Sequence, residues 1–243
     1  MISVCIATYN GALYLESQLR SILTQLDEGD EIIVSDAGSN DRTIAIIESL
    51  CDKRIKLYNF NGELSKSKIP VFAKMDNIRY NFENALKMAK GDIIFLADQD
   101  DIWLPNKVEK MVAALQDASL VVHDCEVFNG NEVLIPSFMD FMKPTIGRWK
   151  TFIRPVFMGC CMAFNKKVLQ KSLPMPNLHI EHDVYIGLCA YKEGIVKVIK
   201  EPLIRYRRHG KNASSCAEES KNSLWIKFLR RWYMLLAYFS INN

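Results

Sequence analysis

Segments typical of buried strands alternate at short intervals with segments typical of amphipathic helices through the first hundred residues. Residues 2–7 and 31–35 are strand-like runs, and a further strand is predicted over 55–58. A helix that begins at the Asn40-Asp41 cap is predicted between the second and third strands. The helix predicted between the first two strands rests on apolar residues at helical spacing, which are Leu15, Leu19, Ile22, Leu23 and Leu26. This βαβαβ order predicts an α/β fold with a mainly parallel sheet.

The remaining pattern continues the alternation and then becomes less regular. After a polar loop over 59–68 we expect a helix over about 75–90, with Gly91 as its C-cap, and a strand over 92–97. The further elements expected are a helix over 105–116, strands over 120–123, 125–128, 133–135 and 157–164, a helix over 181–192, and strands over 195–199 and 203–207. A length of 243 residues suits one such domain, predicted over 1–212, followed by a basic, aromatic helical tail over 213–243.

Charge is distributed unevenly along the chain, although the formal net charge is only +3. From residue 205 onward eight Lys and Arg face two Glu, a net charge of +6 that leaves −3 for the preceding residues. A basic C-terminal part suggests an anionic partner, either a diphosphate or a membrane surface. Without a secretory signal or an apolar run of membrane-spanning length, we expect a cytoplasmic protein, or one peripheral on the inner face of the cytoplasmic membrane.

The seven cysteines show no C-x-x-C pair and no regular spacing. An odd count of this kind argues against a disulfide framework and for free thiols in a reducing compartment. We therefore expect the cysteines to be small buried hydrophobic residues.

An acidic cluster, Asp98-Gln99-Asp100-Asp101, directly follows the strand predicted over 92–97. Three carboxylates this close repel one another, and a cation would offset that repulsion. Hard oxygen donors suit Mn²⁺ or Mg²⁺, which proteins hold with one or two carboxylates and substrate phosphates. The alternative is a solvated loop whose aspartates cap the following helix.

Two further polar turns follow the first and second predicted strands, over 8–11 and 36–41. In open α/β sheets ligands bind beyond the carboxyl ends of the strands, so the three turns should converge on one pocket that can hold a nucleotide. Neither a G-x-G-x-x-G fingerprint nor a G-x-x-x-x-G-K-[ST] phosphate loop is present, which speaks against NAD-binding and P-loop functions.

Four segments together, over 4–11, 33–39, 95–103 and 206–212, resemble the motifs of family 2 glycosyltransferases of the GT-A fold. The D-Q-D-D-x-W form is similar to the rhamnosyltransferase-like branch of bacterial surface polysaccharide synthesis. The resemblance implies a Rossmann-like mixed, mainly parallel sheet flanked by helices. It also implies a nucleotide-diphosphate sugar as donor, a glycan or lipid-linked acceptor, and Mn²⁺ or Mg²⁺ as cofactor.

The resemblance also implies roles for individual residues. The residues expected to contact the donor are Thr8, Tyr9, Asn10, Asp36, Ser39, Asp41, Lys74, Arg79, Asp98, Gln99 and Arg207. Asp36 would reach the base and Asp98 the ribose. Asp98 and Asp100 would form the D-x-D metal pair, with His209 as a further metal ligand or phosphate contact; the alternative is an exposed histidine.

Asp183, in Glu181-His182-Asp183, resembles the catalytic base of the family. Inverting transfer needs one carboxylate to accept the proton of the acceptor hydroxyl, and a place in the first helical turn favours the ionised form. The alternative is an ordinary carboxylate at a helix start. Relatives commonly have Gly at the position of Arg79, which would either contact the diphosphate or face solvent.

The basic strip made by Arg205, Arg207, Arg208 and Lys211 is expected near the diphosphate, because guanidinium groups fit phosphate geometry. Nucleic acid is the rival partner, but the aromatic residues that could stack on bases lie in a helical stretch of the tail, so we expect no nucleic acid. That stretch suits either an interfacial membrane helix or a helix packed on the domain or on a partner.

Three functions follow from these patterns, and the first is favoured. The chain would be an inverting, metal-dependent glycosyltransferase. The second possibility is a non-catalytic scaffold that binds nucleotide sugars. The third is a glycoside hydrolase with two carboxylates, against which the nucleotide-pocket motifs speak.

Overall fold

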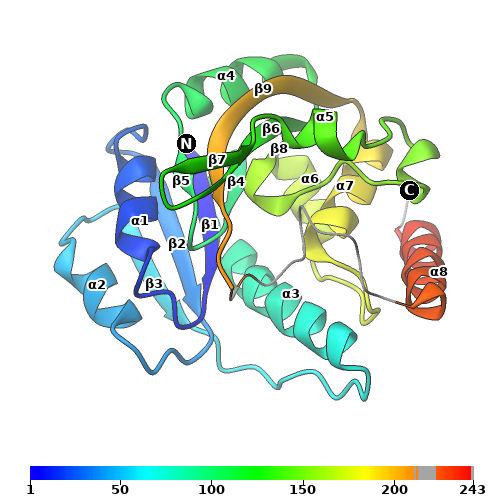
Figure 1. The fold of residues 1–243 in the computed structure, drawn as a ribbon, viewed down its shortest axis with the longest axis horizontal. Coiled ribbons are helices and arrows are strands. Elements are labelled where there is room, and N and C mark those ends of the chain that lie inside the picture. The colour runs from blue at the N-terminus through cyan, green and yellow to red at the C-terminus, as the bar shows by residue number, and fades with distance from the viewer. Residues whose placement is uncertain (211, 213–222, 242–243) are drawn as a thin grey trace.

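The computed structural model describes residues 1–210, 212 and 223–241, which form a mixed sheet covered by helices (Figure 1). The strands are β1 (Ile2–Thr8), β2 (Glu31–Asp36), β3 (Ile55–Asn59), β4 (Ile93–Ala97), β5 (Ile102–Trp103), β6 (Leu120–Asn129), β7 (Glu132–Ile135), β8 (Met162–Asn165) and β9 (Val196–Arg207). They are ordered β3-β2-β1-β4-β8-β6-β9-β5, with β7 paired to β6. The expected mainly parallel α/β sheet is thereby confirmed.

Helices join and cover these strands. They are α1 (Leu15–Leu23), α2 (Thr43–Ser49), α3 (Pro70–Met88), α4 (Lys107–Ala114), α5 (Phe138–Met142), α6 (Lys166–Ser172), α7 (His182–Glu193) and α8 (Leu224–Ser240). Single 3-10 turns are η1 (Leu115–Asp117), η2 (Lys150–Phe152) and η3 (Gly159–Cys161). The short helices α5 and α6 fall in stretches for which the sequence pattern predicts no element.

Four parallel strands, β3, β2, β1 and β4, form the first half of the sheet. Thr8 pairs with Asp36, and Asp36 pairs with Asn59, so the carboxyl ends of three strands lie side by side. Every residue of β2 is buried, both its apolar run 32–34 and its polar ends, and α1 covers the sheet with the apolar face that its spacing predicts. This register places the two polar turns after β1 and β2 next to each other.

The second half of the sheet is mixed: β8 runs antiparallel to β4 and β6, whereas β6 and β9 are parallel. The strands expected separately over 120–123 and 125–128 are one strand, and so are those expected over 195–199 and 203–207. Asp124 and Pro202 interrupt the apolar runs and look like the ends of strands. In the structure they are paired with each other at a register shift, and the pairing of β6 with β9 continues on both sides. The acidic loop leaves β4 and returns as β5, which pairs with β9.

The helix expected over 75–90 begins earlier, at Pro70, because proline suits the first turn of a helix. The role predicted for Gly91 is wrong, since the helix ends at Met88 and its C-cap is Ala89. A Cβ at Gly91 would lie 2.7 Å from the backbone nitrogen of Ser3, so this glycine allows a close approach of two backbones. The strand expected over 157–164 is confined to β8, and the turn η3 precedes it.

The C-terminal helix α8 packs on α7 and η2 with one face, which contains Met234, Ala237 and Tyr238. The tail is therefore packed on the domain, one of the two alternatives for this stretch; residues 213–222 of the predicted tail lie outside the described residues. Among the helices in the described ranges, none has the length and apolar character required to cross a membrane.

Candidate active site

Asp36, at the end of β2, joins the turns that follow β1 and β2. Its carboxylate accepts hydrogen bonds from the Thr8 hydroxyl at 2.7 Å, the Ser39 hydroxyl at 2.6 Å, and the backbone N–H groups of Gly38 at 3.0 Å and Ser39 at 2.7 Å. Gly38 has a φ of +81°, which glycine adopts without strain. Asp36, which was predicted to contact the nucleotide base, is thus buried, and its hydrogen bonds hold the two turns together.

Asn10 and Asp41 connect the same turns a second time. Asn10 adopts a φ of +50°, donates its backbone N–H to the Ser39 hydroxyl at 2.8 Å, and accepts from the Asn40 N–H at 2.9 Å. Asp41 accepts from the N–H of Ala12 at 3.1 Å and from the Thr43 N–H at the start of α2. Both predicted donor-site residues therefore shape the backbone of the turns after β1 and β2.

Gln99 links the acidic loop to the first turn. Its carboxamide accepts from the Tyr9 N–H at 3.0 Å and donates to the Tyr9 carbonyl at 3.2 Å. A side chain at Gly11 would collide with this carboxamide. The structure thus brings together the three polar turns that the sequence places after β1, β2 and β4, and it leaves the Tyr9 ring exposed at their rim.

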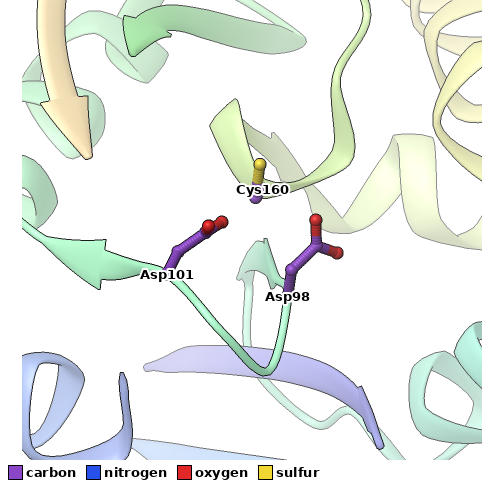
Figure 2. Close-up of side chains that lie close together, drawn as sticks. All are labelled: Asp98, Asp101 and Cys160. Carbon is purple, nitrogen blue, oxygen red and sulfur yellow. The ribbon is translucent and has the colours of Figure 1, made fainter. Parts of the chain in front are cut away.

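Two carboxylates and a thiol face one another beneath the loop. Figure 2 shows Asp98 and Asp101 on the loop after β4 and Cys160 opposite them, on η3. One ligand atom of each residue lies within 4.8 Å of the others. Asp101 is fully buried; its Oδ1 accepts from the Arg207 N–H at 3.0 Å, whereas its Oδ2 has no hydrogen-bond partner among the described residues.

The acidic groups of this cluster lie close together, and their pKa values are raised. Burial, reinforced by the charges of Asp100 and Asp183, raises the pKa of Asp98 to about 7. Burial and the neighbouring carboxylates raise the pKa of Asp101 well above its ordinary value. The pKa of the Cys160 thiol is also raised, by its hydrogen bond with Cys161 and by burial. A cation would relieve these charges, and the carboxylate oxygens suit Mn²⁺ or Mg²⁺.

Asp100 points to the end of β9. Its Oδ2 lies 2.8 Å from Nε2 of His209, and its carbonyl accepts from Nε of Arg207 at 2.8 Å. The Arg207 guanidinium lies 4.6 Å from the ring centres of Tyr14 and Phe128. Asp100 and His209 are therefore brought together as the resemblance implies, while Asp98 is grouped with Asp101 and Cys160.

The other residues of the basic strip are placed differently. Arg205 pairs with Glu126, Nε to Oε1 at 2.8 Å, and stacks on Phe128. Arg208 donates its backbone N–H to the Phe128 carbonyl at 2.7 Å, and Lys211 lies outside the described residues. Within this strip, Arg207 contacts the acidic loop through Asp100 and Asp101.

Lys107, which the sequence analysis does not single out, is fully buried beside the cluster. Its ammonium group donates to the Cys160 carbonyl at 2.8 Å and lies 4.0 Å from the Trp103 ring centre. Burial lowers its pKa to about 8. At the start of an amphipathic helix a lysine reads as a surface residue, and nothing in the local pattern distinguishes this one.

Asp183 lies in the first turn of α7, as predicted. Its Oδ2 accepts from the Gly159 N–H at 3.1 Å, and its Oδ1 accepts from the Val184 N–H at 2.7 Å. Gly159 belongs to the same 3-10 turn as Cys160, so the carboxylate expected to act as base is tied to the turn that faces the acidic loop.

The two remaining basic candidates occupy opposite environments. Arg79 is 1% exposed, so its solvent-facing alternative is wrong. It donates to the Pro176 carbonyl at 2.8 Å, which attaches the segment before α7 to α3, and it lies 3.7 Å from Asp76 of the same helix. Lys74 is exposed, and its ammonium group lies 3.4 Å from the Asn212 carbonyl, three residues beyond His209.

Together these features define a GT-A-type glycosyltransferase. The polar turns are hydrogen-bonded to one another at the carboxyl edge of the parallel strands, a histidine contacts the acidic loop, and a helix carries a carboxylate. The chain belongs to the family described as Glycosyl transferase family 2, which it matches over residues 3–173.

Named relatives and solved structures agree with this family. Over 252 residues the chain is 26% identical to the UDP-Glc:alpha-D-GlcNAc-diphosphoundecaprenol beta-1,3-glucosyltransferase WfgD of Escherichia coli, covering 99% of this chain and 93% of WfgD. It is 32% identical to the dTDP-rhamnosyl transferase RfbG of Shigella flexneri over 51% of this chain and 37% of RfbG. Staphylococcal (S. aureus) TarS in complex with UDP-GlcNAc superposes with a TM-score of 0.66 at 18% identity, covering 99% of this chain and 73% of that chain.

Proposed function

We propose that this glycosyltransferase moves a sugar, with inversion, from a nucleotide-diphosphate donor to a glycan or lipid-linked acceptor in bacterial surface polysaccharide synthesis. The observation that carries the proposal is the junction of the three turns through Asp36 and Gln99, next to the buried carboxylate of Asp101, whose Oδ2 has no hydrogen-bond partner among the described residues. The similarity to WfgD, whose acceptor is a diphosphoundecaprenol-linked sugar, supports the lipid-linked class. The similarity to RfbG keeps a deoxyhexosyl donor among the candidates.

In this proposal the pocket rim binds the nucleoside and the basic groups bind the diphosphate. Thr8, Tyr9 and Asn10 border the base and ribose. Asp36 and Asp98 supply carboxylates toward the nucleoside side. Arg207 and Lys74 lie at the β9 end of the pocket, where their positive charges favour a diphosphate. Arg79 is buried in contacts of its own, which favours a supporting role over a contact with the donor.

We assign a divalent cation such as Mn²⁺ or Mg²⁺ to Asp98, Asp100 and His209, of which Asp100 and His209 are in contact, whereas Asp98 lies with Asp101 and Cys160. The unpartnered Oδ2 of Asp101 and the raised pKa of Asp98 both indicate negative charge that a cation would stabilise. When bound, the cation neutralises the departing diphosphate. Mn²⁺ accompanies GDP-Man in a mannosyltransferase of Pyrobaculum calidifontis that superposes with a TM-score of 0.62 at 20% identity, covering 98% of this chain and 63% of that chain.

Asp183 would take the proton from the acceptor hydroxyl as the new bond forms. Its place in the first turn of α7 favours the carboxylate form, because the N-terminal end of a helix carries partial positive charge. The Gly159 N–H holds the carboxylate in position without neutralising it.

A donor-turnover assay in Mn²⁺ tests these assignments. Asp183→Asn and Asp100→Asn should each lower turnover by about 100-fold or more, the usual range for removing a general base or a metal ligand. Asp27→Asn is the matched control, because Asp27 is an exposed carboxylate in the loop between α1 and β2. Wild-type turnover in either site variant would reject the role of that residue.

A non-catalytic scaffold that binds nucleotide sugars is the second candidate, favoured by the fact that the clamped turns alone could bind a nucleotide. It predicts metal-dependent donor binding with no turnover against any acceptor pool.

An enzyme confined to the cytoplasm or peripheral on the inner face of the cytoplasmic membrane would meet both donor and lipid-linked acceptor, and we propose that location.

A further inference from the structure

The helix α8 has two different faces. The inward face packs on the domain, where Arg230 forms an ion pair with Glu181 and Arg231 donates to the Ile153 carbonyl at 2.6 Å. The outward face carries an apolar stripe, each of whose members is between 39% and 73% exposed: Trp225, Phe228, Trp232, Leu236 and Phe239. Their spacing of three or four residues keeps them on one side of the helix. Figure 1 shows α8, in red, at the edge of the molecule beyond α7.

A second exposed segment lies against α8. The ring of Trp149 is 5.3 Å from that of Tyr238, and Phe152 is 5.7 Å from the same ring. In the segment 141–154 exposed apolar and cationic side chains are interleaved, namely Phe141, Lys143, Ile146, Arg148, Trp149, Lys150, Ile153 and Arg154. This segment contains no acidic residue. The two neighbouring elements thus present aromatic and aliphatic groups together with positive charge.

We propose that the outward stripe of α8 and the segment 141–154 form one docking face for an anionic lipid surface. Neither element contains Asp or Glu, and five of their seven Lys and Arg are exposed, namely Lys143, Arg148, Lys150, Arg154 and Lys227, whereas Arg230 and Arg231 face the domain. Amphipathic helices with Trp, Phe and Leu on one side and cations nearby lie in the interface of such membranes. A second copy of the chain would bring the same cations face to face, so charge complementarity favours anionic lipid over self-association.

This inference rests on the proposed function and deepens it, because a lipid-linked acceptor is presented at a membrane surface. The position of the face supports the connection. Glu181, the partner of Arg230, lies two residues before Asp183, and α8 packs directly on α7. Docking through α8 would therefore hold the membrane beside the helix that carries the proposed base.

Flotation of the full-length chain with vesicles tests the proposal. Vesicles of phosphatidylcholine with phosphatidylglycerol should bind the protein, with binding weakened by salt, and vesicles of phosphatidylcholine alone should bind it much less. Each of Trp225→Ala and Trp232→Ala should weaken binding by about tenfold, equivalent to about 1.4 kcal/mol. Leu13→Ala is the control, because Leu13 is an exposed apolar side chain just before α1, and Figure 1 shows α1 on the opposite side of the molecule from α8.

Donor turnover and melting temperature, measured on the same variants, separate this inference from the proposed function. Variants that lose vesicle binding but keep both properties support the docking face. A wild-type chain that turns over donor yet ignores anionic vesicles overturns the docking face alone. Vesicle binding without turnover overturns the proposed function alone. Equal binding to neutral vesicles would overturn the requirement for anionic lipid, and a dimer that Trp232→Ala dissociates would show that a second copy of the chain covers the stripe.

Discussion

Replacing Asp98 with Asn should stabilise the metal-free protein at neutral and higher pH. The folded state raises the pKa of this carboxyl from 3.8 to about 7. Between these values the unfolded chain has released the proton that the folded chain retains, so stability falls as pH rises through the window. A shift of about three units corresponds to about 4 kcal/mol, at about 1.4 kcal/mol per unit. The Asn side chain has the same shape and carries no charge to bury.

Urea unfolding in EDTA at about pH 4 and about pH 8 measures this effect. We expect the two proteins to differ little at the lower pH, and Asp98→Asn to be more stable by up to about 4 kcal/mol at the higher pH. That gain would raise the melting temperature by roughly 8–16 °C for a domain of this size. Parallel stability profiles for the two proteins across this range would refute the reasoning, because they would mean that Asp98 is ionised in the folded state without cost.

Three further predictions concern packing, a buried pair and ligand binding. Gly91→Ala should lower the free energy of unfolding by about 1–3 kcal/mol, since its Cβ would meet Ser3, whereas Gly29→Ala, with open space around it, should change it little; urea titrations that show equal effects would contradict the close approach. Asp76→Ala should lower the free energy of unfolding by about 3–5 kcal/mol, because it leaves Arg79 buried without its counter-charge. A decrease below about 1 kcal/mol would show that the arginine finds another partner. A nucleotide sugar with Mn²⁺ at about 100 times its Kd should stabilise the protein by about 2.7 kcal/mol in a thermal-shift assay, and chelation that leaves this gain intact would argue against a metal-dependent donor site.

Local patterns predicted the first half of the fold well. The apolar runs of β1, β2 and β4 and the spacing of α1 each determine their own element, and parallel strands then bring their carboxyl ends together. Prediction was poorer in the second half. Asp124 and Pro202 interrupt apolar runs and look like turns, yet both lie inside long strands, because a register shift accommodates them only when the partner strand is present.

The site shows the same division. The motif residues Asp36, Gln99 and Asp183 lie where their segments predict, at strand ends and in a helical first turn. Lys107 and Cys160, by contrast, have no sequence signal, since one looks like a surface lysine and the other like an ordinary core thiol. Cys160 meets the acidic loop because β8, which follows it, inserts between β4 and β6, and Lys107 is bonded to the Cys160 carbonyl.

The tail gives a third case. Its composition predicted an apolar, basic helix but left open whether that helix binds a membrane, a partner or its own domain. Packing on α7 and η2 buries Tyr238 and engages Arg230 and Arg231, which leaves the stripe containing Trp225 and Trp232 outward.

The sequence alone determined the element types of the first half, the edge where the polar turns meet, and the family. These depend on interactions between residues near one another in the chain, or on a strand order that parallel pairing enforces. Tertiary structure alone decided which carboxylates are buried, which cations lie beneath them, and which face of the last helix meets solvent. Burial and charge compensation arise between segments distant in sequence, so no local pattern contains them.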